Sequence, residues 1–295
     1  MLILDKPLRL STDIDILVEP GTDVENYIDK ASKIFPFLAK DEDVRKGKNG
    51  IVKRHFKFTY FSPVRNKKFY ILLDIVFAHL PYAKTVEKEI KNDLLLTTGN
   101  NLSVTIPTAE CILGDKLTAF APHTTGIRLG TERELEIAKQ LYDTAILTDY
   151  LFDYDMFSET YKTAVAEEIQ FRGENWDAGY VLRDTIRACM SIVSRGGYDK
   201  EDYAEYLRGI KSLKNHILES GYNVEDATWK ACKVMYLASC LISDNAYQKI
   251  INPEEYITSR LEGDDYKKLA YVRKAKPEAF AFLVEATRNL AEIKL

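Results

Sequence analysis

Two aspartates near the start of the chain are spaced so that they could bind a metal ion. Residues 8–18 are predicted to form a strand, and side chains alternate between the two faces of a strand. Ser11, Asp13 and Asp15 then point the same way, with the two carboxylates roughly 7 Å apart along the strand. Carboxylates this close repel each other unless a cation lies between them, and Mg²⁺ prefers such hard oxygen ligands. The alternative is a solvent-exposed strand end before the turn at residues 19–21.

A third aspartate interrupts the apolar run of residues 69–77. Asp74 lies inside this run, which is typical of a central strand covered on both faces. Burying an unpaired carboxylate costs several kcal/mol, so a partner must compensate for it. A metal shared with Asp13 and Asp15 would do so, and three carboxylates are the arrangement used for phosphoryl chemistry with two metal ions. An arginine or backbone N–H groups are the alternative partners.

Both strands and helices are predicted around these residues. Strands are predicted at residues 8–18, 51–61, 68–78 and 102–106, and residues 82–97 fit either a helix or a strand. One helix is predicted from Thr22, with Glu25 as its capping partner, and another from Thr108. Amphipathic helices are predicted at residues 131–153, 156–171, 176–194, 200–219, 223–245, 253–261 and 266–292. The predicted fold class is therefore α+β, with a mixed-sheet domain over residues 1–150 and an α-helical bundle domain over residues 151–295.

The composition excludes several classes of protein. Of the 295 residues, 46% are hydrophobic and 29% are charged, which excludes intrinsic disorder. No stretch approaches the roughly 20 apolar residues of a membrane span, and the first residues lack the basic start of a signal peptide. The four cysteines form no CxxC pair, which favours free thiols in a reducing compartment. We expect a cytoplasmic protein that does not contact a membrane.

Four segments occur in an order that resembles a known family. They are Ser11-Thr-Asp-Ile-Asp15, Asp74 in its apolar strand, the segment from Glu110 to Phe120 that contains Lys116, and Lys139-Gln-Leu-Tyr-Asp143. Together they resemble the AbiEii/AbiGii toxin family of nucleotidyltransferases, which is part of the polymerase-β-like superfamily. The resemblance covers about residues 1–150 and implies a nucleotidyltransferase-like mixed-sheet domain. It also implies that a nucleotide is transferred from an NTP to an acceptor with Mg²⁺ or Mn²⁺ as the metal.

The resemblance assigns a role to each of five catalytic residues. Asp13 and Asp15 would hold the metal against the triphosphate, and Asp74 would complete the metal site and help to activate the acceptor hydroxyl. Lys116 would neutralise triphosphate charge, and Asp143 would orient Lys116 or contact a substrate. The alternative for Lys116 is a solvated helix lysine, and the alternatives for Asp143 are an exposed helix acid and an ion pair with Lys139.

The predicted nucleotide-binding residues are Ser11, Lys116, Thr124 and Thr125. The two threonines and His123 lie in the loop of residues 121–126, which joins the predicted helices of Lys116 and Asp143, and polar surface is the alternative for the histidine. The superfamily also carries a Gly-Gly-Ser/Thr or Gly-Ser element before the DxD strand, and residues 1–10 contain none. An N-terminal segment is then missing, or the protein is a degenerate relative with impaired catalysis; we expect the first, and either would weaken NTP binding.

Residues 44–73 contain no acidic residue and many basic and aromatic ones. The basic residues are Arg45, Lys46, Lys48, Lys53, Arg54, Lys57, Arg65, Lys67 and Lys68. Such a strand pair could contact RNA, and the resemblance points to tRNA as acceptor; the alternative is that the charges face solvent and the aromatic rings face the core.

The expected function is that of the toxin of a toxin–antitoxin system in phage abortive infection. Its expected partners are an NTP, a tRNA acceptor and a cognate antitoxin protein. A small-molecule (antibiotic-type) nucleotidyltransferase and a catalytically inactive binding protein of the same fold are the alternatives.

Overall fold

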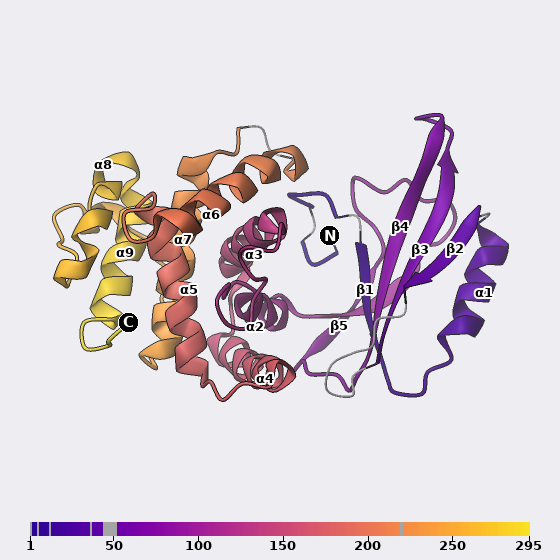
Figure 1. The fold of residues 1–295 in the computed structure, drawn as a ribbon, viewed down its shortest axis with the longest axis horizontal. Helices are drawn as coiled ribbons and strands as arrows, with labels where there is room; N and C mark the ends of the chain where they lie inside the picture. The colour runs from indigo at the N-terminus through magenta and orange to yellow at the C-terminus, as the bar shows by residue number, and fades with distance from the viewer. Residues whose placement is uncertain (1, 5, 12, 36, 44–51, 219–220) are drawn as a thin grey trace. The chain divides into compact units, whose positions relative to one another are not determined.

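The computed structural model describes residues 2–4, 6–11, 13–35, 37–43, 52–218 and 221–295 (Figure 1). It contains helices, a four-stranded sheet and a two-stranded sheet, which confirms the predicted α+β class. The chain forms two compact units. We call Leu10–Pro81 the sheet unit, and Met1–Arg9 with Tyr82–Leu295 the helical unit.

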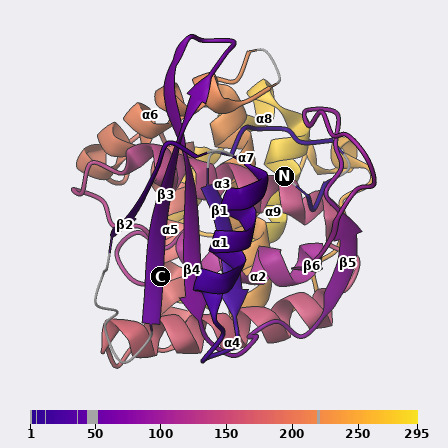
Figure 2. The same ribbon diagram turned by 90° about the vertical axis from the view of Figure 1, so that its right-hand side faces the viewer.

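The sheet unit is a four-stranded sheet with one helix on one face. Its strands are β1 (Asp13–Val18), β2 (Ala39–Asp43), β3 (Val52–Ser62) and β4 (Lys67–Phe77), in the order β1-β4-β3-β2. Strand β1 runs parallel to β4, and the other two pairs are antiparallel. Helix α1 (Val24–Ile34) lies across the sheet (Figure 2). Its Val24 and Ile28 pack against Phe56, Phe58 and Ile75, so the core of this unit lies on the α1 side.

Three local predictions for this unit are corrected by the structure. Helix α1 is capped by Asp23, whose side chain accepts a hydrogen bond from the backbone N–H of Asn26, and not by Thr22. Strand β2 was not predicted, because its sequence is charged and fully exposed at the edge of the sheet and shows no apolar alternation. Strand β4 is central, as predicted, but only Ile75 within it is fully buried, so its apolar run does not reflect cover on both faces.

The helical unit has a large core shared by its long helices. The α-helices are α2 (Ala109–Ala119), α3 (Glu134–Leu147), α4 (Tyr154–Arg172), α5 (Ala178–Val193), α6 (Lys200–Leu213), α7 (Val224–Ile242), α8 (Val272–Ala275) and α9 (Pro277–Asn289). Short 3₁₀ helices are η2 (Thr148–Tyr150), η3 (Lys214–His216), η4 (Pro253–Tyr256) and η5 (Asp264–Leu269). The two-stranded sheet consists of β5 (Thr85–Glu89) and β6 (Ser103–Pro107). Residues 82–97, which fit either a helix or a strand by sequence, therefore contain a strand and no helix.

Most predicted helices of this unit are present, and Thr108 caps α2 as expected. Two predicted helices differ in more than the position of their ends. The expected helix at residues 253–261 is only the 3₁₀ turn η4, and the expected helix at 266–292 is divided before Pro277. Proline has no backbone N–H and therefore begins α9 rather than continuing α8.

The compact units divide the chain differently from the predicted boundary at residue 150. Helices α2 and α3, which precede that residue, share one core with α4 to α7 and α9. The first residues also belong to this unit. Arg9 forms an isolated β-bridge with Ile217, the backbone N–H of Leu218 donates to the carbonyl of Leu8 at 2.9 Å, and Ile3 and Leu4 pack against the core.

Candidate active site

The three predicted metal ligands share one face of the four-stranded sheet. In the parallel pairing of β1 with β4, Asp15 lies opposite Asp74, and Asp13 lies opposite Leu72. Paired residues of neighbouring strands point to the same face, and the strands are about 4.8 Å apart. Ile75, the next residue after Asp74, faces α1. The three carboxylates therefore lie on the sheet face that α1 does not cover.

Asp74 is not the buried carboxylate that the sequence predicted. Its side chain is 39% exposed, and its Oδ1 lies 2.7 Å from Nδ1 of His55. His55 is the register partner of Asp74 in the antiparallel β3–β4 pairing. An ionised carboxylate can only accept hydrogen bonds, so Nδ1 of His55 donates. The partner of Asp74 within the described structure is thus a histidine and not an arginine.

The donors of this face fit Mg²⁺ in type. Carboxylate oxygens are hard ligands, and Mg²⁺ commonly binds through one or two carboxylates and completes its shell with water and substrate phosphates. Among the described residues, no three or more His, Cys, Asp or Glu side chains are grouped so that they could hold a metal ion as they stand, so a metal here would be bound by two of these carboxylates or after a side-chain rearrangement. Asp13 and Asp15 are exposed on this face.

The other two predicted catalytic residues lie together in the helical unit. Lys116 is on α2 and Asp143 is on α3, and Nζ of Lys116 lies 3.0 Å from Oδ2 of Asp143. Asp143 therefore pairs with Lys116, as one of its two predicted roles required. It does not pair with Lys139, whose Nζ is 3.8 Å from Oε1 of Glu136.

Arg9 is a member of this cluster that the sequence did not reveal. Its Nε and Nη2 donate to the two oxygens of Asp143, each at 2.6 Å. Burial acts to raise the pKa of Asp143, but the hydrogen bond from Arg9 and the charges of Lys116 and Arg9 outweigh it and hold that pKa below its ordinary value. One carboxylate between two cations leaves the cluster with a net positive charge.

The predicted nucleotide ligands of the 121–126 loop form hydrogen bonds within the protein. Thr124 and Thr125 are buried. The hydroxyl of Thr124 donates to Asp184 at 2.8 Å, and that of Thr125 donates to the carbonyl of Thr118 at 2.8 Å. Nε2 of His123 lies 2.6 Å from Oδ2 of Asp202. These contacts stabilise the loop, and we do not propose its residues as nucleotide ligands.

Ser11, the remaining predicted nucleotide ligand, is exposed on the sheet unit. Its hydroxyl donates to the backbone carbonyl of Asp13 at 3.3 Å. Its orientation is thus tied to the strand that carries Asp13 and Asp15.

Strand register separates the basic and aromatic residues of β3 and β4 into two faces. Phe56 and Phe58 are buried on the α1 side, as the alternative interpretation required. On the face of Asp74, Phe61 and Tyr70 are about half exposed and accompany Lys57 and Lys68. The ammonium of Lys57 lies 4.7 Å from the centre of the Tyr70 ring. Arg45, Lys46 and Lys48 lie outside the described residues.

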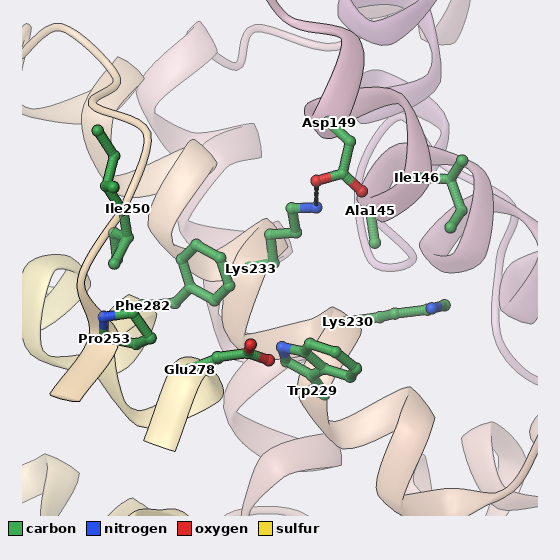
Figure 3. A pocket seen from close by; sticks show the side chains of 11 residues that line it. Ala145, Ile146, Asp149, Trp229, Lys230, Lys233, Ile250, Pro253, Glu278 and Phe282 are labelled. Atoms are coloured by element: carbon green, nitrogen blue, oxygen red, sulfur yellow. Dashed lines mark hydrogen bonds and ion pairs between the residues drawn. The ribbon is translucent and has the colours of Figure 1, made fainter. Parts of the chain in front are cut away.

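A separate pocket of about 360 Å³ lies in the helical unit (Figure 3). Its walls come from α3, α7, α9 and the segment 250–253, and they include Trp229 and Phe282. Its charged lining residues have partners: Lys233 pairs with Asp149, Oε2 of Glu278 lies 3.9 Å from Nζ of Lys276, and the ammonium of Lys230 lies 5.0 Å from the centre of the Tyr142 ring. None of the predicted site residues lines it.

Comparisons with known proteins identify a family. The family model described as "Nucleotidyl transferase AbiEii toxin, Type IV TA system" matches residues 1–233. A search of curated proteins gives no significant match. A similar solved structure is that of JHP933 from Helicobacter pylori, with 13% sequence identity, 80% of this chain and 77% of that chain covered, and a TM-score of 0.41. None of the described helices is long and apolar enough to cross a bilayer.

Proposed function

Because this chain belongs to the AbiEii family of nucleotidyl transferase toxins of type IV toxin–antitoxin systems, we propose that it transfers a nucleotide from an NTP to an acceptor with the help of Mg²⁺. The observation that supports the metal is the register that sets Asp15 beside Asp74, with Asp13 on the same sheet face. A family of toxins also implies a cognate antitoxin. We propose the cytoplasm as the place of action.

In this proposal, the sheet unit carries the metal ligands, and the helical unit carries a cationic group of its own. Asp13, Asp15 and Asp74 would bind Mg²⁺, which neutralises triphosphate charge and makes the acceptor hydroxyl easier to deprotonate. Lys116 donates one N–H to Asp143 and one to Oε1 of Gln140 at 3.5 Å, which leaves a third N–H that can contact a phosphate oxygen. Asp143, held by Arg9, fixes the direction of the Lys116 ammonium.

We propose RNA, and tRNA in particular, as the acceptor. The supporting observation is the exposed group of Lys57, Lys68, Phe61 and Tyr70 on the same sheet face as Asp74. Lysines neutralise backbone phosphates, and exposed aromatic rings stack on unpaired bases, which contributes about 1–3 kcal/mol per base. An unpaired RNA end combines phosphates and accessible bases, and therefore fits such a surface.

The test of the function is a transfer assay with four α-labelled NTPs and Mg²⁺, with bulk tRNA or an aminoglycoside as acceptor, together with a measurement of NTP binding. We expect label on RNA, loss of transfer in EDTA, and a loss of at least about 100-fold in the Asp13→Ala/Asp15→Ala double variant. The control is Glu87→Ala/Glu89→Ala, which removes two exposed acids of the same spacing from strand β5 of the helical unit and should keep the wild-type rate.

Three results of this assay would contradict the proposal. Equal transfer by the Asp13/Asp15 double variant would exclude the metal site. Label on an aminoglycoside and not on RNA would favour a small-molecule nucleotidyltransferase. Absence of transfer and of NTP binding with every NTP would favour an inactive binding protein.

A matched pair of variants tests the RNA surface. Tyr70→Ala should weaken tRNA binding by about 5- to 100-fold, because it removes one stacking ring. Tyr27→Ala removes a similar exposed ring beside a lysine, Lys30, but from α1, and should leave binding unchanged. Equal binding by the wild type and Tyr70→Ala would show that this face does not bind the acceptor.

A further inference from the structure

Asp74 has a different neighbour on each side within the sheet. On β1, its register partner is Asp15, a second carboxylate. On β3, its register partner is His55, whose Nδ1 lies 2.7 Å from Oδ1 of Asp74. The central carboxylate of the group is thus placed between a like charge and a hydrogen-bond donor.

The hydrogen bond from His55 restricts an otherwise loosely held side chain. Rotation of an aspartate carboxylate about its last bond is broad and has no sharp energy minima. Asp74 is 39% exposed, so tight packing does not fix it, whereas the His55 side chain is 22% exposed and lies in a paired strand. A hydrogen bond to an ionised carboxylate is among the stronger ones in proteins. It engages Oδ1 and leaves Oδ2 outside this hydrogen bond.

We propose that His55 is a positioning residue that orients the Asp74 carboxylate for binding the metal. This inference rests on the proposed Mg²⁺-dependent function. His55 acts through Asp74, in the way that groups behind a metal ligand commonly fix its orientation. Its role is to reduce the rearrangement that Asp74 needs when the metal binds.

The architecture allows this role to be separated from a structural one. The β3–β4 pairing continues through eleven register pairs, and the buried core of the unit lies on the opposite face of the sheet. Loss of one side-chain hydrogen bond on the exposed face should therefore leave the fold intact. The melting temperature of the metal-free protein checks this directly.

The experiment is a titration of the full chain with Mn²⁺ alone, followed by electron paramagnetic resonance. His55→Phe keeps a ring but removes the donor, and we expect it to weaken Mn²⁺ binding by about 10-fold or more. His55→Asn places an amide N–H close to the position of Nδ1 and should bind Mn²⁺ within about threefold of the wild type. His79→Phe is the matched control, because His79 forms an exposed pair with Glu19 in the same unit. It should not change binding.

Each outcome of this titration either supports or overturns the inference. Asp74→Asn is measured in parallel, and if it leaves Mn²⁺ binding unchanged, the proposed metal site itself is wrong. If Asp74→Asn weakens binding and His55→Phe does not, only the positioning role is wrong. Equal losses of Mn²⁺ binding in His55→Phe and His55→Asn also exclude the positioning role, because restoring a hydrogen-bond donor would then not restore binding. If His55→Phe does not fold, His55→Gln, whose amide lies one bond further out, replaces it with the same expected loss.

Discussion

Replacing Asp143 by Asn should destabilise the helical unit, because it removes the negative charge between two cations. Arg9 donates two hydrogen bonds of 2.6 Å to Asp143, and Nζ of Lys116 lies 3.0 Å away. The three side chains are only 13–26% exposed. Breaking a buried ion pair costs about 3–5 kcal/mol, whereas an exposed pair contributes about 0–1 kcal/mol. For this degree of exposure we expect a loss of about 2–4 kcal/mol in the free energy of unfolding.

Tryptophan fluorescence measures this loss in the relevant unit. Both tryptophans, Trp176 and Trp229, belong to the helical unit, so their emission follows its unfolding. A loss of 2–4 kcal/mol corresponds to a fall in melting temperature of about 5–12 °C for a unit of this size. Asp264→Asn is the control, because Asp264 is 90% exposed and its pair with Lys267 should contribute about 0.5 kcal/mol or less. A loss in Asp143→Asn no larger than in Asp264→Asn would refute the reasoning.

Three further predictions concern the helical unit. The folded-state pKa of Asp143 is lowered, so the ionised side chain contributes its full stabilisation above about pH 4. This contribution disappears as the pH falls through the lowered pKa. In acid unfolding, the stabilities of the wild type and Asp143→Asn should therefore converge below about pH 4. Gly209→Ala should cost about 3 kcal/mol or more in urea unfolding, because its Cβ would lie 2.0 Å from the carbonyl oxygen of Glu134 at the α3–α6 contact. A loss below about 1 kcal/mol would contradict that contact. A thiol reagent should not label the folded protein and should label four thiols after denaturation, because Cys111, Cys189, Cys232 and Cys240 are all buried; labelling before unfolding would show that one is accessible.

Local sequence patterns predicted the elements but not the pairing between them. Strands β3 and β4 carry enough apolar and aromatic residues to be recognised, and the helices follow from their spacing and from caps such as Thr108. Strand β2 has no such pattern, because an edge strand facing solvent can be fully charged. The apolar run around Asp74 predicts more burial than the 39% exposed side chain has, because such a run also occurs in a strand with only one covered face.

Only the part of the candidate site that lies on a single strand is predictable from the spacing of its residues. Alternation along one strand is enough to place Asp13 and Asp15 on the same face. His55 becomes the partner of Asp74 through strand register, and Arg9 contacts Asp143 across 134 residues of sequence. No local sequence pattern encodes either pairing. The loop position of Thr124 predicts a nucleotide ligand, but its hydroxyl donates to Asp184, a residue of α5, inside the helical unit.

The measurement that tests the central claim most directly is the rate of transfer from an α-labelled NTP with Mg²⁺ by Asp15→Asn and Asp74→Asn. The two residues are register partners on β1 and β4, and each substitution keeps the shape of the side chain while removing one charged metal ligand. The account predicts that each variant loses at least about 100-fold in rate while its melting temperature stays close to that of the wild type. Transfer by Asp74→Asn at the wild-type rate would contradict it.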